Sequence, residues 1–153
     1  MVVTGTEMRV RELAQHLFDL VTHFCLIAPR GRRRRGSLKE VEFLTLSLLH
    51  HHKTLIVGDI QRQLGILPAQ MSRIIRSLET RDPPLIVCRI NPHDKRKIDV
   101  ALTPEGMAAF QDYQSAQLGG ISNLLSKLSE EDLDDLQRLL NKLHDVVGPP
   151  ALG

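Results

Sequence analysis

The sequence predicts a mainly α-helical fold that carries one small β-hairpin. Two features lead to this expectation: a pair of short helices joined by a tight turn, and a pair of β-rich runs directly after them. The helices cover residues 58–64 and 68–79, with Gly65 at the turn, and the β-rich runs cover residues 85–90 and 97–102. A helix-turn-helix followed by a hairpin is a winged helix-turn-helix, and long amphipathic stretches on both sides of it predict a separate helical region.

The second helix of the pair has one apolar face and one polar, basic face. Its apolar residues repeat at intervals of three and four, which predicts a buried stripe: Met71, Ile74, Ile75 and Leu78. The residues left outside are Ala69, Gln70, Arg73, Arg76 and Ser77. Within this helix no acidic side chain precedes Glu79. The outer face therefore suits a helix that enters the DNA major groove between phosphates.

The two β-rich runs are joined by a turn with a basic end. Asn91 and Pro92 open the turn, and Lys95, Arg96 and Lys97 close it. Thr103 follows as a helix N-cap, with Pro104 at the first helical position. A hairpin of this kind directly after a recognition helix is interpreted as a wing.

These residues resemble the MarR family of winged-helix transcription regulators. The most specific marks are the Asp-x-Arg of the wing and the Leu-Thr-x-x-Gly after it, present here as Asp94, Arg96, Leu102, Thr103 and Gly106. The resemblance is close over about residues 38–110, and the helix layout extends over nearly the whole chain. Two departures from the family are Cys88 before Arg89 and a longer link at residues 81–84, while Gln61 departs from helix-turn-helix motifs in general, which carry a small residue there.

The resemblance implies a set of DNA-binding residues. Gln70 and Arg73 are expected to read base edges, and Ser72 and Arg76 to contact phosphates. Ala69 belongs to the same DNA-binding surface. Arg96 is expected to enter the minor groove, with Lys95 and Lys97 on phosphates. Asp94 either holds the Arg96 guanidinium by paired hydrogen bonds or only shapes an Asx-type turn.

Composition and charge agree with one domain of 153 residues that contacts a polyanion. Residues 1–103 hold 17 Lys and Arg against 10 Asp and Glu, whereas residues 104–153 hold 3 against 8. No apolar run is long enough to span a membrane, and two lone cysteines make no disulfide framework, so a cytoplasmic protein is expected. Motifs of nucleophilic, phosphate-binding or metal catalysis are lacking, so an enzyme is not expected.

The flanking helices are expected at residues 6–28, 104–128 and 130–147. By the resemblance, residues 6–28 and 104–147 form a helical dimerisation region, and residues 37–103 form the winged helix. The same apolar periodicity also fits the core of a monomer, and that alternative stays open. Gly119 and Gly120 weaken the middle of the second long helix, where a kink or a close helix approach is expected.

Residues 37–56 are expected to hold a capped helix and a short strand. Ser37 is predicted as N-cap with Glu40 at the third helical position, and residues 54–56 as a strand that pairs with the wing. The residues expected to point inward are Val41, Leu44, Leu48 and Leu49. His50, His51 and His52 are adjacent, which is poor spacing for a metal, so a structural role is expected.

Two further features remain open from the sequence. Arg32–Arg35 belong to a cluster of five arginines that is either a phosphate-contacting arm or a solvated charge run. Cys25 is either an inert thiol or a redox sensor, and Cys88 is expected to be structural.

Together these features predict a dimeric, sequence-specific regulator of transcription, in the form of a repressor that a small ligand or another signal releases from a pseudo-palindromic operator. No cofactor is expected beyond an unidentified effector. The alternatives are a winged-helix module that binds protein and a nonspecific DNA-binding protein.

Overall fold

The computed structural model describes residues 2, 4–27 and 37–148, and the described residues fall into two compact units on either side of the gap at residues 28–36. The first unit is the helix α1 (Gly5–Ile27). Thr4 and Glu7 stabilise its start reciprocally, because the Thr4 amide donates to the Glu7 carboxylate and the Glu7 amide donates to the Thr4 hydroxyl. The predicted helix at residues 6–28 is therefore confirmed up to Ile27, while Arg32–Arg35 lie outside the described residues.

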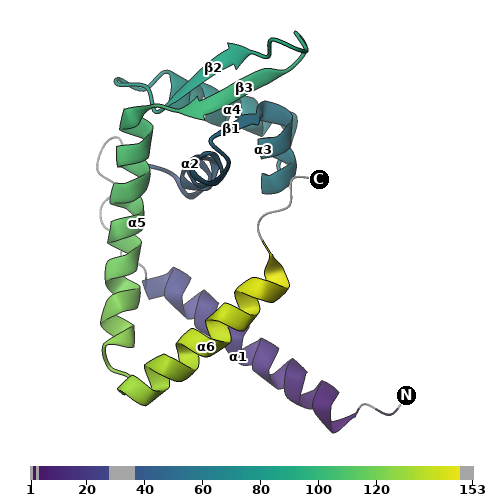
Figure 1. Ribbon diagram of the computed structural model, residues 1–153, viewed down its shortest axis with the longest axis vertical. Helices are drawn as coiled ribbons and strands as arrows, with labels where there is room; N and C mark the ends of the chain where they lie inside the picture. Colours follow the sequence, from purple (N-terminus) through teal and green to yellow (C-terminus); the bar gives the residue numbers. More distant parts are fainter. Residues whose placement is uncertain (1, 3, 28–36, 149–153) are drawn as a thin grey trace. The chain divides into compact units, whose positions relative to one another are not determined.

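The second unit contains the winged helix, and α5 extends from it to a final helix (Figure 1). Its elements in chain order are α2 (Glu40–His52), β1 (Thr54–Ile56), α3 (Val57–Leu64), α4 (Pro68–Glu79), β2 (Ile86–Ile90), β3 (Ile98–Leu102), α5 (Pro104–Leu125) and α6 (Glu130–Val147). The mainly α-helical class with one small β-sheet is confirmed. The second long helix ends at Leu125 rather than Leu128, because residues 126–128 form a turn before the Ser129 cap.

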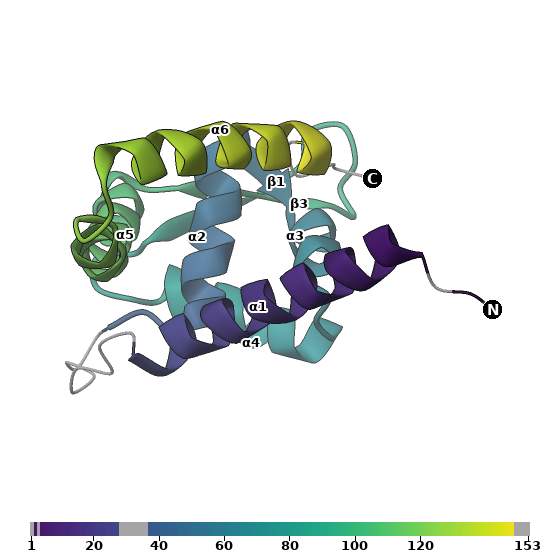
Figure 2. The ribbon, with the colours of Figure 1, turned by 90° about the horizontal axis from the view of Figure 1, so that it is seen from below.

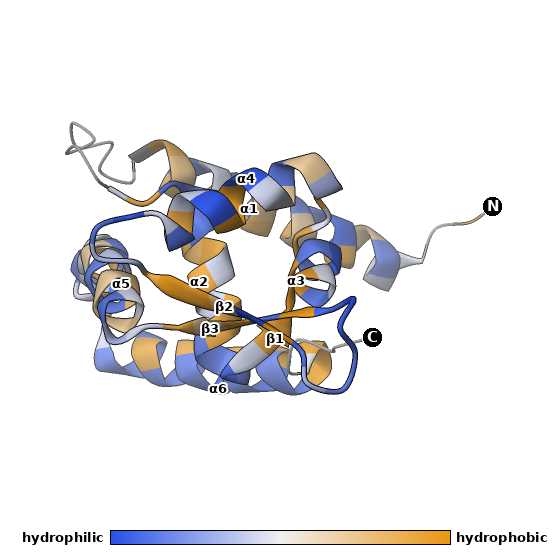
Figure 3. Cartoon of the chain, turned by 90° about the horizontal axis from the view of Figure 1, so that it is seen from above, coloured by the Kyte–Doolittle hydropathy of each residue, from blue (hydrophilic) through white to orange (hydrophobic). Residues whose placement is uncertain are grey.

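The sheet has three antiparallel strands in the order β1-β3-β2. In the hairpin Ile86 pairs with Leu102 and Ile90 with Ile98, while on the other edge Leu55 pairs with Val100. The predicted short strand beside the wing is thus confirmed. Figure 3 shows the sheet apolar over the helices and hydrophilic in the loop that joins β2 to β3, as expected for a hairpin that leaves the body of the unit.

The core lies between the sheet and α2, α3 and α4, with α2 in the middle and α5 beside it (Figure 2). Its largest fully buried apolar side chains are Leu46, Leu49, Ile60, Met71, Leu78, Ile86 and Val100. The predicted stripe of α4 is confirmed at Met71, Ile74 and Leu78, while Ile75 is half-buried. Gly65 has φ +63° and ends α3 in the left-handed conformation that glycine adopts without strain.

The start and the inner face of α2 differ from the prediction. Lys39, not Ser37, is the N-cap, and Glu42, not Glu40, occupies the third helical position and accepts the Lys39 amide at 2.9 Å. Leu49 is buried as predicted, and Val41 and Leu48 are half-buried, but Leu44 is exposed. Glu42 and Thr45 are buried instead, because polar partners satisfy them: Thr45 donates to the Val41 carbonyl, and Glu42 binds residues of other segments.

Candidate nucleic-acid interface

The outer surface of α4 presents the side chains that the sequence predicted for it. Ala69, Gln70, Ser72, Arg73 and Arg76 are all exposed. Pro68 starts the helix, and the buried Met71, Ile74 and Leu78 fix the opposite side against the core. The structure therefore brings a short polar and basic surface together on one helix, clear of the core.

Ser77 is exposed on the same outer surface, as predicted, and its hydroxyl also binds another part of the molecule. It donates to Glu42 Oε2 at 2.9 Å, which ties the flank of α4 to the first turn of α2. Ser77 is thus engaged with a residue 35 positions away in the sequence, a contact that helical periodicity does not contain.

The wing loop is built on Asn91. Its Oδ1 accepts the backbone amides of His93 at 2.8 Å and Asp94 at 3.0 Å, and its Nδ2 donates to Asp99 at 2.9 Å. The ends of the loop are closed by the Asn91 amide, which donates to the Lys97 carbonyl at 2.9 Å. Sequence reasoning placed Asn91 in a turn but missed this organising role, although an Asn-Pro pair that opens a turn signals it.

Asp94 and Arg96 form the paired contact that the sequence suggested. Arg96 Nε donates to Oδ1 at 3.1 Å and Nη2 to Oδ2 at 3.2 Å. The Arg96 amide also donates to Oδ1 at 3.1 Å, so the Asx-type turn and the ion pair coexist. These bonds from Arg96, together with the nearby Lys97, hold the pKa of the Asp94 carboxyl below its usual range.

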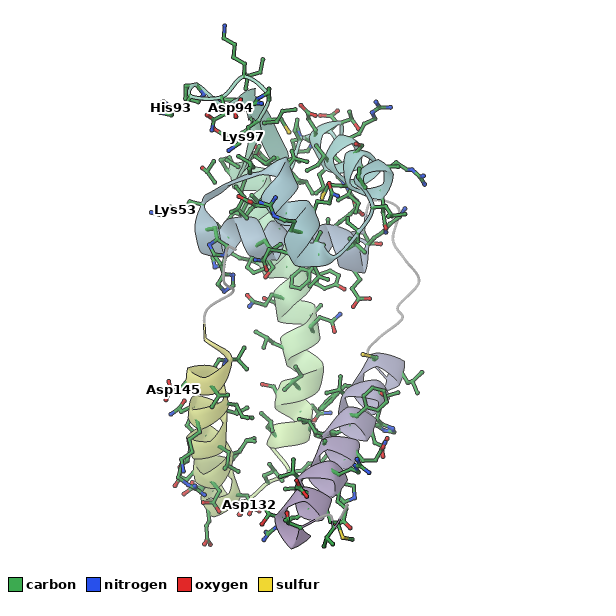
Figure 4. The ribbon with its side chains drawn as sticks, turned by 90° about the vertical axis from the view of Figure 1, so that its right-hand side faces the viewer. Lys53, His93, Asp94, Lys97, Asp132 and Asp145 are labelled. Atoms are coloured by element: carbon green, nitrogen blue, oxygen red, sulfur yellow. The ribbon has the colours of Figure 1, made fainter. Side chains whose placement is uncertain are left out.

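The cations of the wing remain open to solvent. Lys95, Arg96 and Lys97 are exposed, and 90% of the Arg96 side chain is accessible although Asp94 holds it. Figure 4 places His93, Asp94 and Lys97 at the tip of the wing, at the opposite end of the second unit from Asp132 in α6. Within this unit the basic tip of the wing thus lies far from the acidic first turn of α6.

The base of the wing is joined to α4 and α5 by backbone contacts. Leu85 donates to the Leu78 carbonyl at 3.0 Å and accepts the Thr103 amide at 3.1 Å. Thr103 caps α5 as predicted, since its hydroxyl accepts the Gly106 amide at 3.0 Å, and it also donates to the Pro84 carbonyl at 2.6 Å. These contacts hold the link at residues 81–84 against the start of α5.

Two of the histidines at the end of α2, His50 and His51, have structural contacts. The His50 ring stacks on Phe110 with centroids 4.7 Å apart, and His51 Nδ1 donates to the Ser47 carbonyl at 2.8 Å. Among the described residues, no group of three His, Cys, Asp or Glu side chains is placed to hold a metal ion. None of the helices in the described ranges combines the length and the apolar character needed to cross a membrane.

The two cysteines differ in their surroundings. Cys25 is exposed near the end of α1, whereas Cys88 is half-buried on β2. Burial, followed by the neighbouring Glu79 carboxylate, raises the pKa of the Cys88 thiol, which disfavours the reactive thiolate form. The structural role predicted for Cys88 agrees with this environment.

The fold and this surface define a winged-helix protein. Residues 38–98 match the model of the MarR family. Over 102 residues the chain is 28% identical to the HTH-type transcriptional repressor MdtR of Bacillus subtilis, a match that spans 67% of this chain and 64% of that relative. The family model and this relative both match the winged-helix region, and over it the chain is similar to regulators of the MarR family.

Solved structures share the same fold. A MarR family protein from Bacillus stearothermophilus superposes with a TM-score of 0.77 at 18% identity, covering 92% of this chain and 96% of that one. A single-residue mutant of S. aureus MepR, bound to an oligodeoxyribonucleotide, superposes with a TM-score of 0.61 at 23% identity, covering 88% of this chain and 98% of that one.

Proposed function

We propose that the protein is a regulator of transcription that binds double-stranded DNA in a sequence-specific manner. The observation that carries this proposal is the pairing of two exposed basic surfaces in one winged helix: the outer face of α4 and the Asp94-held Arg96 of the wing. A helix fits the major groove of B-DNA, and an arginine at the end of a hairpin fits the adjacent minor groove. The MepR complex with an oligodeoxyribonucleotide supports DNA as the partner.

The position of each residue in α4 determines whether we assign it to base edges or to phosphates. Gln70 and Arg73 lie in the first half of the helix, where recognition helices contact base edges, and their amide and guanidinium groups make bidentate bonds to adenine and guanine. Ser72 and Arg76 contact phosphates, and the small Ala69 lets the helix approach the base pairs closely. Phosphate contacts set the register of the protein, and base contacts select the sequence.

The wing supplies the second contact. Arg96 enters the minor groove, where a narrow A·T-rich segment attracts a guanidinium. Lys95 and Lys97, exposed on each side of Arg96, contact phosphates. Asp94 adds a negative charge close to DNA, yet it favours binding because it fixes the guanidinium before the complex forms.

The protein acts as a homodimer, with its helical segments forming the interface. In α6, apolar residues recur on one face, and no residue of this described helix is buried within the chain. In α1 the apolar residues are exposed as well: Val10, Leu13, Leu17, Leu20 and Val21. A second copy that covers these faces removes them from water and places two copies of α4 on one pseudo-palindromic site.

Repression released by a small molecule is the mode of action we favour, with no resident cofactor. The relative MdtR is described as a transcriptional repressor, which supports this direction of control. A DNA-binding regulator acts in the compartment that holds the DNA, which in bacteria such as B. subtilis is the cytoplasm. The exposed Cys25 makes an oxidant the second class of signal to test.

The test is selection of bound sequences from random duplex DNA, followed by binding measurements at two salt concentrations. We expect an enriched inverted repeat with half-sites about one helical turn apart. Gln70→Ala and Arg73→Ala are then expected to relax the preference at defined base positions. Binding without enrichment that vanishes at higher salt would instead indicate nonspecific attraction to phosphates. Absence of DNA binding at both salt concentrations would favour a module that binds protein.

A further inference from the structure

Glu42 is a buried carboxylate that the proposed DNA surface does not use. Glu42 is only 2% exposed, and it lies in the first turn of α2. A charged group is rarely placed in such a position unless several donors satisfy it. The donors around Glu42 therefore indicate what the carboxylate does.

Three residues donate to this carboxylate. The Lys39 amide donates to Oε1 and the Ser77 hydroxyl to Oε2, each at 2.9 Å. Arg81 Nη2 lies 3.2 Å from both oxygens, and 23% of the Arg81 side chain is accessible. Burial alone raises the pKa of Glu42, but these hydrogen bonds and the Arg81 charge outweigh it and lower the pKa.

The three donors come from three different segments. Lys39 precedes α2, Ser77 lies in the last turns of α4, and Arg81 opens the link to the wing. Ser77 follows Arg73 by four residues and Gln70 by seven, so the three share one flank of the helix. A bond that fixes Ser77 against α2 consequently fixes the rotation of α4 about its own axis.

We propose that Glu42 is a positioning residue for DNA recognition, which sets the rotation of α4 and anchors the start of the wing link without touching DNA. This inference rests on the proposed function for its readout in DNA. An apolar residue of similar volume could fill the same space with comparable stability. The role of the buried charge is therefore to fix the geometry of these segments. A carboxylate with three hydrogen-bonding partners allows one arrangement of them, whereas apolar packing tolerates several.

The experiment compares Glu42→Gln with a matched change on the same helix. Gln keeps the size of the side chain, but it replaces one carboxylate oxygen by an NH2 group, which cannot accept a hydrogen bond from Arg81. Thr45→Ala is the control, because Thr45 is also fully buried on α2 and its hydroxyl donates only to the Val41 carbonyl within that helix. Ser77→Ala is a second test variant that removes one hydroxyl and leaves the charge pair in place.

The first readout is the ratio of dissociation constants for a scrambled and a selected duplex, measured well below the melting temperature of each variant. We expect Glu42→Gln to lower this ratio about tenfold and Ser77→Ala about threefold, with Thr45→Ala unchanged. The double variant of Glu42→Gln and Ser77→Ala is expected to match Glu42→Gln alone, because Glu42→Gln already disrupts the contact that Ser77→Ala removes.

The second readout needs no DNA. Amide hydrogen exchange of residues 76–85, normalised to residues 98–102, is expected to accelerate in Glu42→Gln and not in Thr45→Ala. If the wild-type protein does not distinguish the two duplexes, the proposed function fails, and the exchange rates still decide the positioning role. Unchanged exchange of residues 76–85 in both Glu42→Gln and Ser77→Ala would overturn it.

Discussion

The winged helix and the final helix of the second unit show the same kind of amphipathic pattern but different degrees of burial. In α4, Met71, Ile74 and Leu78 repeat at helical spacing and are buried in the core of the chain. In α6, leucines repeat at the same spacing, yet Leu143 is 52% exposed. The winged helix buries its apolar stripe within one unit, whereas no residue of α6 is buried among the described residues.

This difference shows what periodicity reports and what it omits. A repeat at three and four residues indicates that one face of a helix leaves water, but it does not identify the surface that covers that face. For α4 the cover is the core beneath the sheet. For α6 we infer a second copy of the chain, and the following predictions test each side of this comparison.

The largest effect is expected at Gly106, within the completed core. A Cβ atom added there would lie 1.9 Å from the Leu85 carbonyl oxygen, which is backbone and cannot swing aside. We expect Gly106→Ala to lower the free energy of unfolding by about 1–3 kcal/mol, as overpacked core sites do. Urea denaturation followed by circular dichroism measures this. A loss below about 0.5 kcal/mol would mean that the junction of wing and α5 adapts more freely than described.

The next effect is expected at the apolar face of α6. Leu143→Lys places a charge on that face, and we expect dissociation of the dimer with about a hundredfold loss of DNA affinity, since one copy holds one half-site. Analytical ultracentrifugation and DNA titration measure the two effects. Asn141→Lys adds the same charge on the opposite side of the helix and should change neither. Equal behaviour of both variants would refute the assigned interface.

Asp94→Ala tests a contact that is complete within the wing. We expect about fivefold weaker binding to a selected duplex, although a negative charge is removed, because Arg96 loses its two side-chain bonds. Competition titration at constant salt measures the change. Asp99→Ala provides a comparison, since it removes a wing carboxylate that binds Asn91 rather than Arg96. Tighter binding by Asp94→Ala would show that the charge outweighs the positioning.

Gly119 offers the counterpart to Gly106. Both glycines lie in α5, but no described atom outside the local helix backbone and chain neighbours lies within 4 Å of a Cβ added at Gly119. Gly119→Ala is therefore expected to raise the free energy of unfolding by about 1 kcal/mol through helix propensity. Thermal unfolding at several protein concentrations measures this. A decrease would reveal a close helix approach in the dimer, the alternative that the Gly-Gly pair suggested from sequence.

The smallest effect is a dependence of stability on acid pH. Because the folded-state pKa of Glu42 lies below its ordinary value of 4.5, its contribution is complete above that pH and is lost as the pH falls through the lower folded-state pKa. Urea denaturation between neutral pH and about pH 3 measures the slope. Glu42→Gln should flatten the curve in this window. An identical slope in both proteins would assign the acid sensitivity to other carboxylates.

Local patterns predicted the winged helix well. Glycine at the end of α3, proline at the start of α4 and the Thr103 cap of α5 act over a few residues, so the boundaries of these elements follow from neighbouring chemistry. The Asp94–Arg96 pair was predictable for the same reason, because two positions separate its members. The roles of these residues on DNA stay predictions until the selection experiment is done.

The start of α2 shows where local patterns fail. Ser37 and Glu40 fit the spacing of a capping box, yet the helix begins later and Glu42 takes the role at its third position. The reason lies in partners that are distant in the sequence, Ser77 and Arg81, which hold the Glu42 carboxylate. Leu44 is exposed for the related reason that the face of α2 toward the core is set by its neighbours in space.

The sequence by itself thus determined the order of helices and strands, the basic outer face of α4 and the wing with its Asp-x-Arg pair, because helix periodicity, caps and turns act over a few residues. Only the tertiary structure decided which carboxylate is buried, that the exposed Ser77 also binds this carboxylate, and that no residue of α6 is buried among the described residues. These features depend on contacts between residues about 35 or more positions apart, or on the lack of such contacts, and no local pattern encodes them.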